Sequence, residues 1–403
     1  MPLAWSLILA RLLVCDPICF QEIGHNVAAL KYFSQAFKDS FDNVVPLCSR
    51  SICPRLAKES GFTPFFRMYY DGYFSDVGPE QDWSDVEQGG FLDSLEALAT
   101  ADARLMIDRW NIGFDDVVMF PHLDFYGVIG LLNVLAHMPK ERQPRVLLRF
   151  IHVMENASHN YPDPEAELLG RIRDLAAKEL RLSFSAETPV LADRLSMLLD
   201  RPVSVTMFPV SPQSKPLAAP ESEHFVVYCP GSARLDKGYL KLEAIFREVR
   251  EVDTDLRITF VVQGLPRVAA MDHQAYARKL FAVPGVEFLP SAISEHEMLR
   301  QYERCSLVLL PYDRGVYALR GSAALMEAAA LGRQVLTLGG LGFSEQVRYF
   351  ALGTVVDSVE QMAAEILKIA GVTRAELNAR ARQAQHRFAA STTADFRLWA
   401  ALQ

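Results

Sequence analysis

The 403-residue sequence lacks the features that mark several classes of protein. The apolar stretch at its N-terminus is broken by Arg11 after ten residues, well short of the roughly 20 that a membrane-spanning helix requires. The same stretch lacks the basic start and the small-residue cleavage site of a secretory signal peptide. Basic residues are in the minority, 41 Lys and Arg against 49 Asp and Glu, so the net charge of −8 disfavours a nucleic-acid partner. With 22% charged residues and 22 each of Gly and Pro, the composition also excludes a disordered or collagen-like chain.

Cysteine is scarce as well, with six residues in the whole chain. Three residues separate Cys15 from Cys19 and four separate Cys48 from Cys53, whereas zinc ribbons and redox loops have two between their cysteines. We therefore expect buried free thiols in a reducing cytoplasm. The apolar residues 12–15 predict a first buried strand, and a peripheral membrane contact of this N-terminal region is the alternative.

What the sequence does have is a regular alternation of short apolar runs with longer amphipathic stretches, which is typical of a parallel sheet covered by helices. A proline-rich break at 209–220 predicts a linker. We therefore predict an α/β protein of two Rossmann-like doubly wound domains facing a cleft, over residues 1–212 and 221–385. The predicted strands are 12–15, 43–48, 116–120, 145–151, 181–184, 203–207, 224–229, 257–263, 286–289, 307–311, 334–338 and 354–356.

One stretch does not fit this alternation. Residues 71–93 hold seven acidic residues and no Lys or Arg, interleaved with aromatic residues and glycines. Two interpretations stay open, a solvated surface loop and a lid that binds an acceptor, since long loops in compact domains are often functional.

The strongest local signal lies between residues 224 and 240. An apolar strand runs into Gly231, then a short polar loop that carries Arg234 and Lys237, then Gly238 and an amphipathic helix. Backbone N–H groups point outward at a helix N-terminus, and two added cations would hold a diphosphate there. The alternative is a pair of solvated cations in a surface loop.

A second signal follows about eighty residues later. The buried strand 307–311 leads into a loop with Arg320, Gly321 and Ser322, and an alanine-rich helix then carries Glu327. Gly321 and Ser322 predict a second helix N-terminus with a capping hydroxyl, and so a second anion site. Glu327 stands among small apolar residues, where it is either an exposed carboxylate or the acceptor of hydrogen bonds from a sugar diol.

In order, spacing and strand–loop–helix context, the two motifs resemble the C-terminal domain of GT-B glycosyltransferases, most closely glycosyltransferase family 4. The resemblance covers most of residues 225–354. In that family a G-x-x-R-x-x-K-G-like loop clamps the diphosphate of a nucleotide sugar, which carries over to Arg234 and Lys237, with Gly238 beside them. The second Glu of the family's E-x7-E motif matches Glu327 in EAAALGRQV, and by resemblance it binds the ribose. The first Glu falls on Leu319, a departure at the position beside the transferred sugar.

This departure leaves the identity of the sugar, and competence for transfer, open. We expect Arg320 or Ser322 to contact phosphate or sugar in its place, and Gly321 is predicted with them to bind the donor diphosphate. Residues 286–311 are similar to the family's base-binding segment, which implies Leu289, Ser291 and Ile293 as the loop around the base.

In the N-terminal half, Gly24 and His25 are similar to the family's glycine loop, which approaches the donor phosphate and the acceptor. His122, in MFPHLDF, resembles the histidine that often contacts the donor sugar. His152 and Asp124 are weaker candidates of the same kind. The resemblance thus places the acceptor on the first domain and the donor on the second.

The resemblance implies a hexosyltransferase-type enzyme of polysaccharide biosynthesis that moves a sugar from a UDP- or GDP-sugar to a glycan, lipid-linked or small-molecule acceptor. No Asp-x-Asp cluster clearly suits a metal, and metal-independent folds of this kind use cations and helix dipoles, so we expect no metal and no other cofactor. If the family's retaining outcome holds, no protein nucleophile is required.

The expected location is the cytoplasm or the inner face of the membrane. A basic helix follows residue 375 with Arg380, Arg382 and Arg387, and by resemblance residues 386–403 return to the first domain. A membrane-facing stripe is the alternative for this helix. For the whole chain the alternative is a catalytically silent nucleotide-sugar-binding or scaffold protein of a polysaccharide assembly system. A nucleotide-sugar epimerase is a third option without supporting motifs.

Overall fold

The computed structural model describes residues 11–20, 26–67, 88–123, 125–151, 164–207, 209–210, 217–218, 224–231, 233–264, 271–290 and 293–401. The chain divides into two compact units. Unit 1 comprises Met1–Pro209 with Asp395–Gln403, and unit 2 comprises Val210–Ala394.

Unit 1 is built on a seven-stranded parallel sheet in the order β3-β2-β1-β4-β5-β6-β7. Its strands are β1 Leu12–Asp16, β2 Val44–Ser49, β3 Thr63–Phe66, β4 Val117–Phe120, β5 Arg145–Phe150, β6 Leu182–Ala186 and β7 Val203–Val205. Its described helices are α1 Asn26–Ala36, α2 Pro54–Ser60, α4 Gln88–Arg109, α5 Phe125–Leu135, the 3-10 turn η2 Lys140–Arg142, α7 Pro164–Ala176 and α8 Pro189–Leu199. Every residue of β1 and β4 is buried, as expected for central strands that are covered on both faces.

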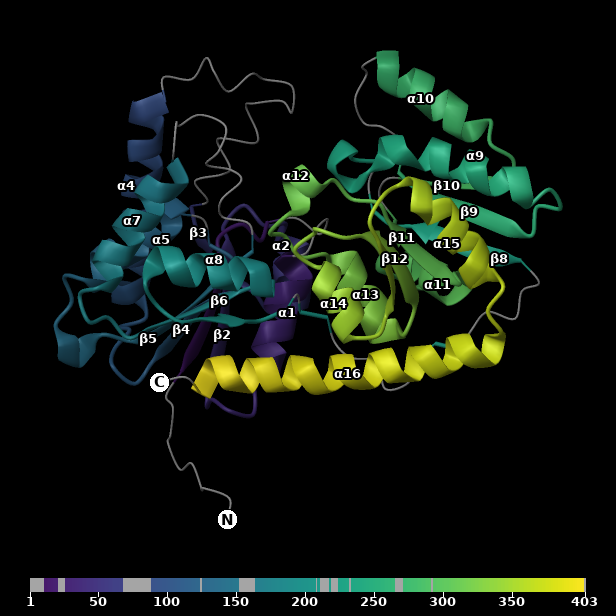
Figure 1. Ribbon diagram of the computed structural model, residues 1–403. Coiled ribbons are helices and arrows are strands. Elements are labelled where there is room, and N and C mark those ends of the chain that lie inside the picture. The colour runs from purple at the N-terminus through teal and green to yellow at the C-terminus, as the bar shows by residue number, and fades with distance from the viewer. Residues whose placement is uncertain are drawn as a thin grey trace. The chain divides into compact units, whose positions relative to one another are not determined.

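Unit 2 repeats this plan with a six-stranded parallel sheet in the order β10-β9-β8-β11-β12-β13. Its strands are β8 Phe225–Cys229, β9 Ile258–Gln263, β10 Val286–Leu289, β11 Leu307–Leu310, β12 Gln334–Leu338 and β13 Gly353–Val356. Its described helices are η3 Leu235–Lys237, η4 Tyr239–Lys241, α9 Leu242–Val252, α10 Met271–Phe281, α11 Glu295–Arg304, α12 Arg314–Tyr317, α13 Ala323–Leu331, α14 Ser344–Tyr349 and α15 Glu360–Ala370. The last helix, α16 Arg374–Ala401, belongs to unit 2 as far as Ala394 and to unit 1 from Asp395 onward. Figure 1 shows α9, α10 and α15 on one side of this sheet and α11, α13 and α14 on the other.

Both sheets reverse their strand order at one point. In unit 1 the chain proceeds outward from β1 in one direction and from β4 in the other, and in unit 2 the corresponding pair is β8 and β11. Ligands of open α/β sheets bind beyond the carboxyl ends of the strands at this switch point. The two loops that carry the sequence motifs follow β8 and β11, so they lie together there.

The predicted α/β class with two doubly wound domains is confirmed, and each predicted strand has its counterpart. The sequence did not reveal β3, a four-residue edge strand that contains Pro64. Three short helices, α2, α12 and α14, were also missed, because four to seven residues are too few to show a helical period. Of the proposed linker only part is described, and Leu217 N–H donates to Leu331 O of α13 within unit 2.

All six cysteines are free, and five are buried as predicted. The prediction was wrong for Cys53, which is exposed immediately before α2. Cys53 is the N-cap residue of that short helix, which begins at Pro54, so it lies outside the strands that bury the neighbouring cysteines.

The carboxyl end of β1 carries a buried acid. Asp16 is fully buried; its Oδ1 accepts a hydrogen bond from Ile18 N–H at 3.0 Å, and Asn26 Nδ2 donates to both oxygens at 3.0 and 3.2 Å. Burial raises the pKa of this carboxyl to about 7, although the hydrogen bonds oppose the shift. Because Asn26 begins α1, Asp16 ties the end of the strand to the start of the helix.

In unit 2, the loop after β8 lies very close to the residue that follows β11. Gly238 has φ +77°, and a Cβ at this position would lie 1.9 Å from Pro311 O. Lys241 Nζ donates to Pro311 O at 3.1 Å and to Tyr312 O at 3.2 Å, and Asp313 N–H donates to Asp236 O at 2.8 Å. The two loops at the switch point are therefore joined through their backbones.

Replacing Asp16 should change how the stability of the protein depends on pH. Between about pH 4 and pH 7 the native carboxyl holds a proton that the unfolded chain has released, so stability falls as the pH rises, by at most about 1.4 kcal/mol per pH unit from this group. Asp16→Asn removes this contribution. The free energy of unfolding is measured by urea unfolding from pH 5 to pH 8 for both proteins. Subtraction of one from the other cancels the groups that they share, so the difference should depend on pH through Asp16 alone. A difference that is constant over this range would contradict the assignment.

Adding a single methyl group at Gly238 should destabilise unit 2. We expect Gly238→Ala to cost about 2–4 kcal/mol, since the left-handed backbone disfavours a Cβ and the Pro311 carbonyl occupies its place. Gly340→Ala is the matched control, with φ +76° and a Cβ that would lie an ordinary 3.6 Å from the Arg314 side chain. It should cost about 1 kcal/mol. Urea unfolding followed by circular dichroism compares them, and equal costs would show that the close approach is absent.

Candidate functional site

The candidate site is the carboxyl edge of the unit 2 sheet between β8 and β11. Residues 230–238 follow β8 and residues 311–322 follow β11. These are the two segments that the sequence singled out, about eighty residues apart, and the sheet order brings them side by side.

The loop after β8 does not lead directly into an α-helix, and in this respect the prediction was wrong. Two 3-10 turns, η3 and η4, separated by Gly238, come first, and α9 begins at Leu242. The left-handed conformation of Gly238 that the close contact with Pro311 requires interrupts the helix. Positive charge in this loop therefore comes chiefly from side chains rather than from an α-helix N-terminus.

Arg234 is anchored by an acid within its own loop. Its Nε donates to Asp236 Oδ1 at 2.9 Å and its Nη2 pairs with Oδ2. Asp236 also accepts a hydrogen bond from the hydroxyl of Tyr317, which belongs to α12 after β11. The Arg234 side chain remains 51% exposed, so it is oriented but still accessible to a ligand.

Lys237 lies deeper, beside the start of the same loop. Gly231 has φ +93°, and a Cβ there would lie 2.3 Å from Lys237 Nζ, so the ammonium fits only because residue 231 has no side chain. The ammonium is 6.0 Å from the centroid of the Tyr312 ring. Burial lowers the pKa of Lys237, as does the neighbouring guanidinium of Arg234, while Asp236 and Glu327 oppose the shift.

Glu327 is not an exposed carboxylate. It is half-buried on α13, and its Oε2 accepts a hydrogen bond of 2.8 Å from the hydroxyl of Tyr302, a fully buried residue of α11. Its charge acts on Lys237 and on the hydroxyls of Tyr228 and Tyr312, so the carboxylate lies near the cationic loop. The structure thus brings Arg234, Lys237 and Glu327 into one neighbourhood.

The residues around the departure at Leu319 are also held in place. Ser322 is the N-cap of α13, as predicted, and its hydroxyl accepts from Leu325 N–H at 3.2 Å. Ser322 is buried and is also hydrogen bonded to Tyr312, so its hydroxyl serves the fold at this point. The Arg320 guanidinium lies 5.6 Å from the Tyr317 ring, and burial lowers its pKa to about 10, which leaves it charged at neutral pH.

Several predicted site residues lie outside the described residues, namely Gly24, His25, Asp124, His152 and Ser291, as does most of the acidic stretch 71–93. Of the predicted base loop, Leu289 ends β10 and Ile293 precedes α11, both half-buried at the same edge of the unit 2 sheet. Gly321 lies half-buried between Arg320 and the cap of α13.

His122 belongs to unit 1, where it follows β4 at the switch point. Burial, together with the nearby Arg149 guanidinium, lowers its pKa to about 3, so the imidazole is neutral at physiological pH. Arg149 is itself buried on β5; it donates to Thr206 O at 3.0 Å and to Pro121 O at 3.4 Å, and it lies 3.8 Å from Glu187. These contacts fix the backbone just before His122.

The residues that the sequence did not single out are the partners of the cations and of Glu327. Besides Asp236 and Tyr302, Gln263 at the end of β9 accepts hydrogen bonds from Gly231 N–H at 2.8 Å and from Tyr228 Oη at 2.9 Å. Asp236 could have been noted, since it is two residues from Arg234. The others are polar or aromatic residues in strands and helices whose role depends on the sheet order.

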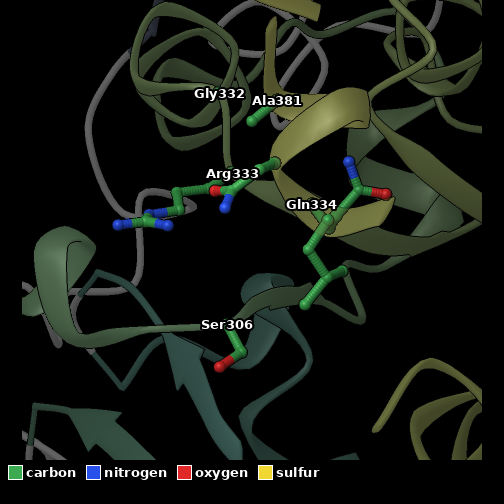
Figure 2. A pocket seen from close by; sticks show the side chains of 7 residues that line it. Ser306, Gly332, Arg333, Gln334 and Ala381 are labelled. Carbon is green, nitrogen blue, oxygen red and sulfur yellow. The ribbon is translucent and has the colours of Figure 1, made fainter. Parts of the chain in front are cut away.

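Two hollows on the molecule lie elsewhere. One is a cavity of about 10 Å³, room for a water molecule at most. Figure 2 shows residues that line it, among them Ser306, Gln334 and Ala381. Arg333 beside it donates to Tyr302 O, Glu303 O and Ala218 O and is a structural residue. A hollow of about 530 Å³ on unit 1 is lined by residues 96–104 of α4 and by Arg171 of α7.

Among the described residues, no group of three or more His, Cys, Asp or Glu side chains is arranged to hold a metal ion. Asp253 and Asp255 form an Asp-x-Asp triplet, but Asp253 pairs with Arg250 and accepts from the N–H groups of Arg257 and Ile258. It therefore closes the turn before β9. In the part of the chain that the structure describes, no helix has both the length and the apolar character to cross a membrane.

Neither a protein-family model nor a curated protein matches this chain. Solved structures do match it. The chain is similar to a UDP-forming α,α-trehalose-phosphate synthase from Burkholderia xenovorans, with 11% identity over 97% of each chain and a TM-score of 0.63. It is also similar to a glycosyltransferase from Rickettsia africae, with 11% identity, 98% of this chain and 99% of the other covered, and a TM-score of 0.62.

A third similar structure is a trehalose-6-phosphate synthase, with 11% identity over 97% of each chain and a TM-score of 0.65. These neighbours are GT-B glycosyltransferases. At this level of identity the likeness concerns the fold, and membership of family 4 stays a prediction. The chain has the two-domain α/β architecture of the GT-B fold.

Proposed function

We propose that this protein is a glycosyltransferase that takes its sugar from a UDP- or GDP-sugar bound at the unit 2 switch point. The observation that carries the proposal is the convergence of Arg234, Lys237 and Glu327 on one edge of the sheet, although Glu327 is ninety residues from Lys237 in the chain. Two cations beside one carboxylate suit a ligand that has a diphosphate at one end and a sugar diol at the other.

The cations would act on the leaving group. Breaking the bond between the sugar and the nucleotide places negative charge on the diphosphate, and fixed positive charges stabilise that charge as it develops. Asp236 holds the exposed guanidinium of Arg234 ready, so little reorganisation is needed when the diphosphate arrives. In this proposal the transfer is metal-independent and retaining, and no residue is assigned as a nucleophile.

The remaining roles follow the same proposal. Glu327 binds the ribose, Leu289 and Ile293 lie beside the base, and Arg320 contacts phosphate or sugar. Unit 1 binds the acceptor, a glycan, a lipid-linked glycan or a small molecule, and the neutral imidazole of His122 contacts the donor sugar. Support comes from the fold neighbours: one is a UDP-forming synthase, and another similar structure, from E. coli, is bound with UDP-2-fluoro glucose. We propose that the enzyme works in the cytoplasm, in polysaccharide biosynthesis.

A second candidate function is a nucleotide-sugar-binding or scaffold protein without catalytic activity. Leu319 favours it, because an apolar side chain stands beside the proposed sugar position where family 4 has a carboxylate. The backbone there is held firmly: a Cβ on Gly342 would lie 2.6 Å from Leu319 C and 2.8 Å from Arg320 O. The difference from the family therefore lies in the side chain. Release of UDP or GDP from its sugar would exclude this candidate.

Removal of the two cations should weaken nucleotide binding. Arg234→Ala/Lys237→Ala should bind UDP and GDP at least about tenfold more weakly per cation, since each charge-assisted contact with a phosphate contributes about 1.4 kcal/mol or more. Isothermal titration calorimetry measures the affinities. Arg247→Ala/Lys279→Ala, which removes the same charge from exposed positions on α9 and α10, should bind like wild type. Unchanged affinity in the first double variant would refute the proposed site.

A carboxylate at position 319 should alter the handling of the sugar and leave nucleotide binding intact. We expect Leu319→Glu to bind UDP and GDP within about threefold of wild type, a difference of less than about 1 kcal/mol, because the residue is placed beside the sugar. The relative rates of hydrolysis of a panel of UDP- and GDP-sugars should change. Leu319→Gln, which has nearly the same shape without the charge, separates the effect of charge from that of size. An unaltered ranking of donors would show that residue 319 does not face the sugar.

A further inference from the structure

The carboxylate of Glu327 is supported by a side chain that no ligand can reach. Tyr302 is fully buried on α11, and its hydroxyl lies 2.8 Å from Glu327 Oε2 and 3.3 Å from Ala324 O, one turn earlier on α13. Its backbone carbonyl accepts a hydrogen bond of 2.7 Å from Nε of Arg333, which is also buried. Both ends of Tyr302 are therefore fixed before any ligand binds.

The ring of Tyr302 also packs against β8, the strand that leads into the loop with Arg234 and Lys237. Tyr228 of β8 meets it edge to face, with the ring centroids 5.5 Å apart and the ring planes at 88°. The hydroxyl of Tyr228 is in turn bonded to Gln263 Oε1, the same atom that accepts the N–H of Gly231. One chain of contacts thus connects the carboxylate of Glu327 with the start of the loop that carries Lys237.

This arrangement has a chemical consequence for the carboxylate. Tyr302 can donate only one proton, and at 2.8 Å it directs that proton at one oxygen of Glu327, which restricts the rotation of the side chain. A carboxylate held in one orientation can accept two hydrogen bonds from a rigid pair of neighbouring hydroxyls without loss of side-chain freedom on binding. A vicinal diol, as in ribose, is such a pair.

We propose that Tyr302 is a positioning residue that makes this protein select nucleotides with an intact ribose diol, by orienting Glu327. This inference rests on the proposed role of Glu327 as the ribose-binding residue. It adds a residue that does not touch the ligand and nevertheless determines how strongly the two ribose hydroxyls contribute to affinity.

The test is the ratio of two affinities, measured by calorimetry with UDP and with 2′,3′-dideoxy-UDP, or with the matching guanine pair if wild type binds GDP more tightly. Wild type should prefer the nucleotide with both hydroxyls by about tenfold or more. Tyr302→Phe, which removes one oxygen atom, should lower this preference several-fold and leave affinity for the dideoxy nucleotide within about twofold of wild type. Equal weakening of both nucleotides would mean a purely structural role and would overturn the inference.

The chain offers a matched control. Tyr276 is a phenol of the same unit whose hydroxyl donates to Tyr239 O and accepts from Glu243 N–H, each at 2.8 Å. Tyr276→Phe removes the same atom from a network that does not include Glu327, so the preference should equal that of wild type. A loss of preference in this variant as large as in Tyr302→Phe would overturn the inference.

A double-variant cycle distinguishes failure of the inference from failure of the proposed function. Glu327→Gln should abolish most of the preference, and adding Tyr302→Phe should lower it little further, because the tyrosine acts through the carboxylate. If Glu327→Gln lowers the preference and Tyr302→Phe does not, the inference fails and the proposed function stands. If wild type binds neither nucleotide, both fail. If it binds both nucleotides equally well, the inference and the ribose-binding role of Glu327 fail, and nucleotide binding at this site stands.

Should Tyr302→Phe not fold, Glu327→Asp tests the same contact from the other side. The shorter side chain keeps the charge and withdraws the carboxylate from the Tyr302 hydroxyl by one methylene group. The preference for the diol should fall as it does in Glu327→Gln. A preference equal to that of wild type would overturn the inference, because the orientation of the carboxylate would then not matter.

Discussion

The backbone contact between Gly238 and Pro311 is the constraint on which the rest of the unit 2 site depends. Two loops that follow neighbouring strands approach so closely that a single Cβ would lie 1.9 Å from a carbonyl oxygen. Lys241 and the Asp313–Asp236 backbone hydrogen bond close the same junction. Because the loops are fixed to each other, the side chains they carry have fixed relative positions, as preorganised binding of a small anion requires.

The cations at this junction are opposite in sign to the net charge of the protein. The chain has a net charge of −8, yet Arg234, Lys237 and Arg320 are gathered at the switch point. Asp236 pairs with Arg234 and so reduces the repulsion between these cations. Asp236 also accepts a hydrogen bond from the Tyr317 hydroxyl. A small dianion can add to such a site, whereas a long polyanion would meet the acidic remainder of the surface. The same acid therefore orients one cation and links the two loops.

Much of the fold follows from local sequence. Strands such as β4 and β11 are short, continuous apolar runs and were recognisable as buried parallel strands. The short edge strand β3 was not, because Pro64 and only four residues leave no period to detect. The 3-10 turns after the cationic loop were missed for a different reason. The residues after Gly238 have a helical pattern, and only contact with Pro311, seventy-three residues later, shows why the α-helix begins at Leu242.

The sequence by itself determined that this is a protein of alternating strands and helices, with cations and one carboxylate in the loops after two of its strands. Periodicity, glycines and residue type are properties of neighbouring residues, so they can be read along the chain. Only the tertiary structure decided which groups meet: that Asp236 serves Tyr317 as well as Arg234, that Tyr302 supports Glu327, and that Asp16 is buried. These contacts follow from the order of strands in each sheet, which joins residues far apart in sequence, and burial then sets the strength and protonation of each group.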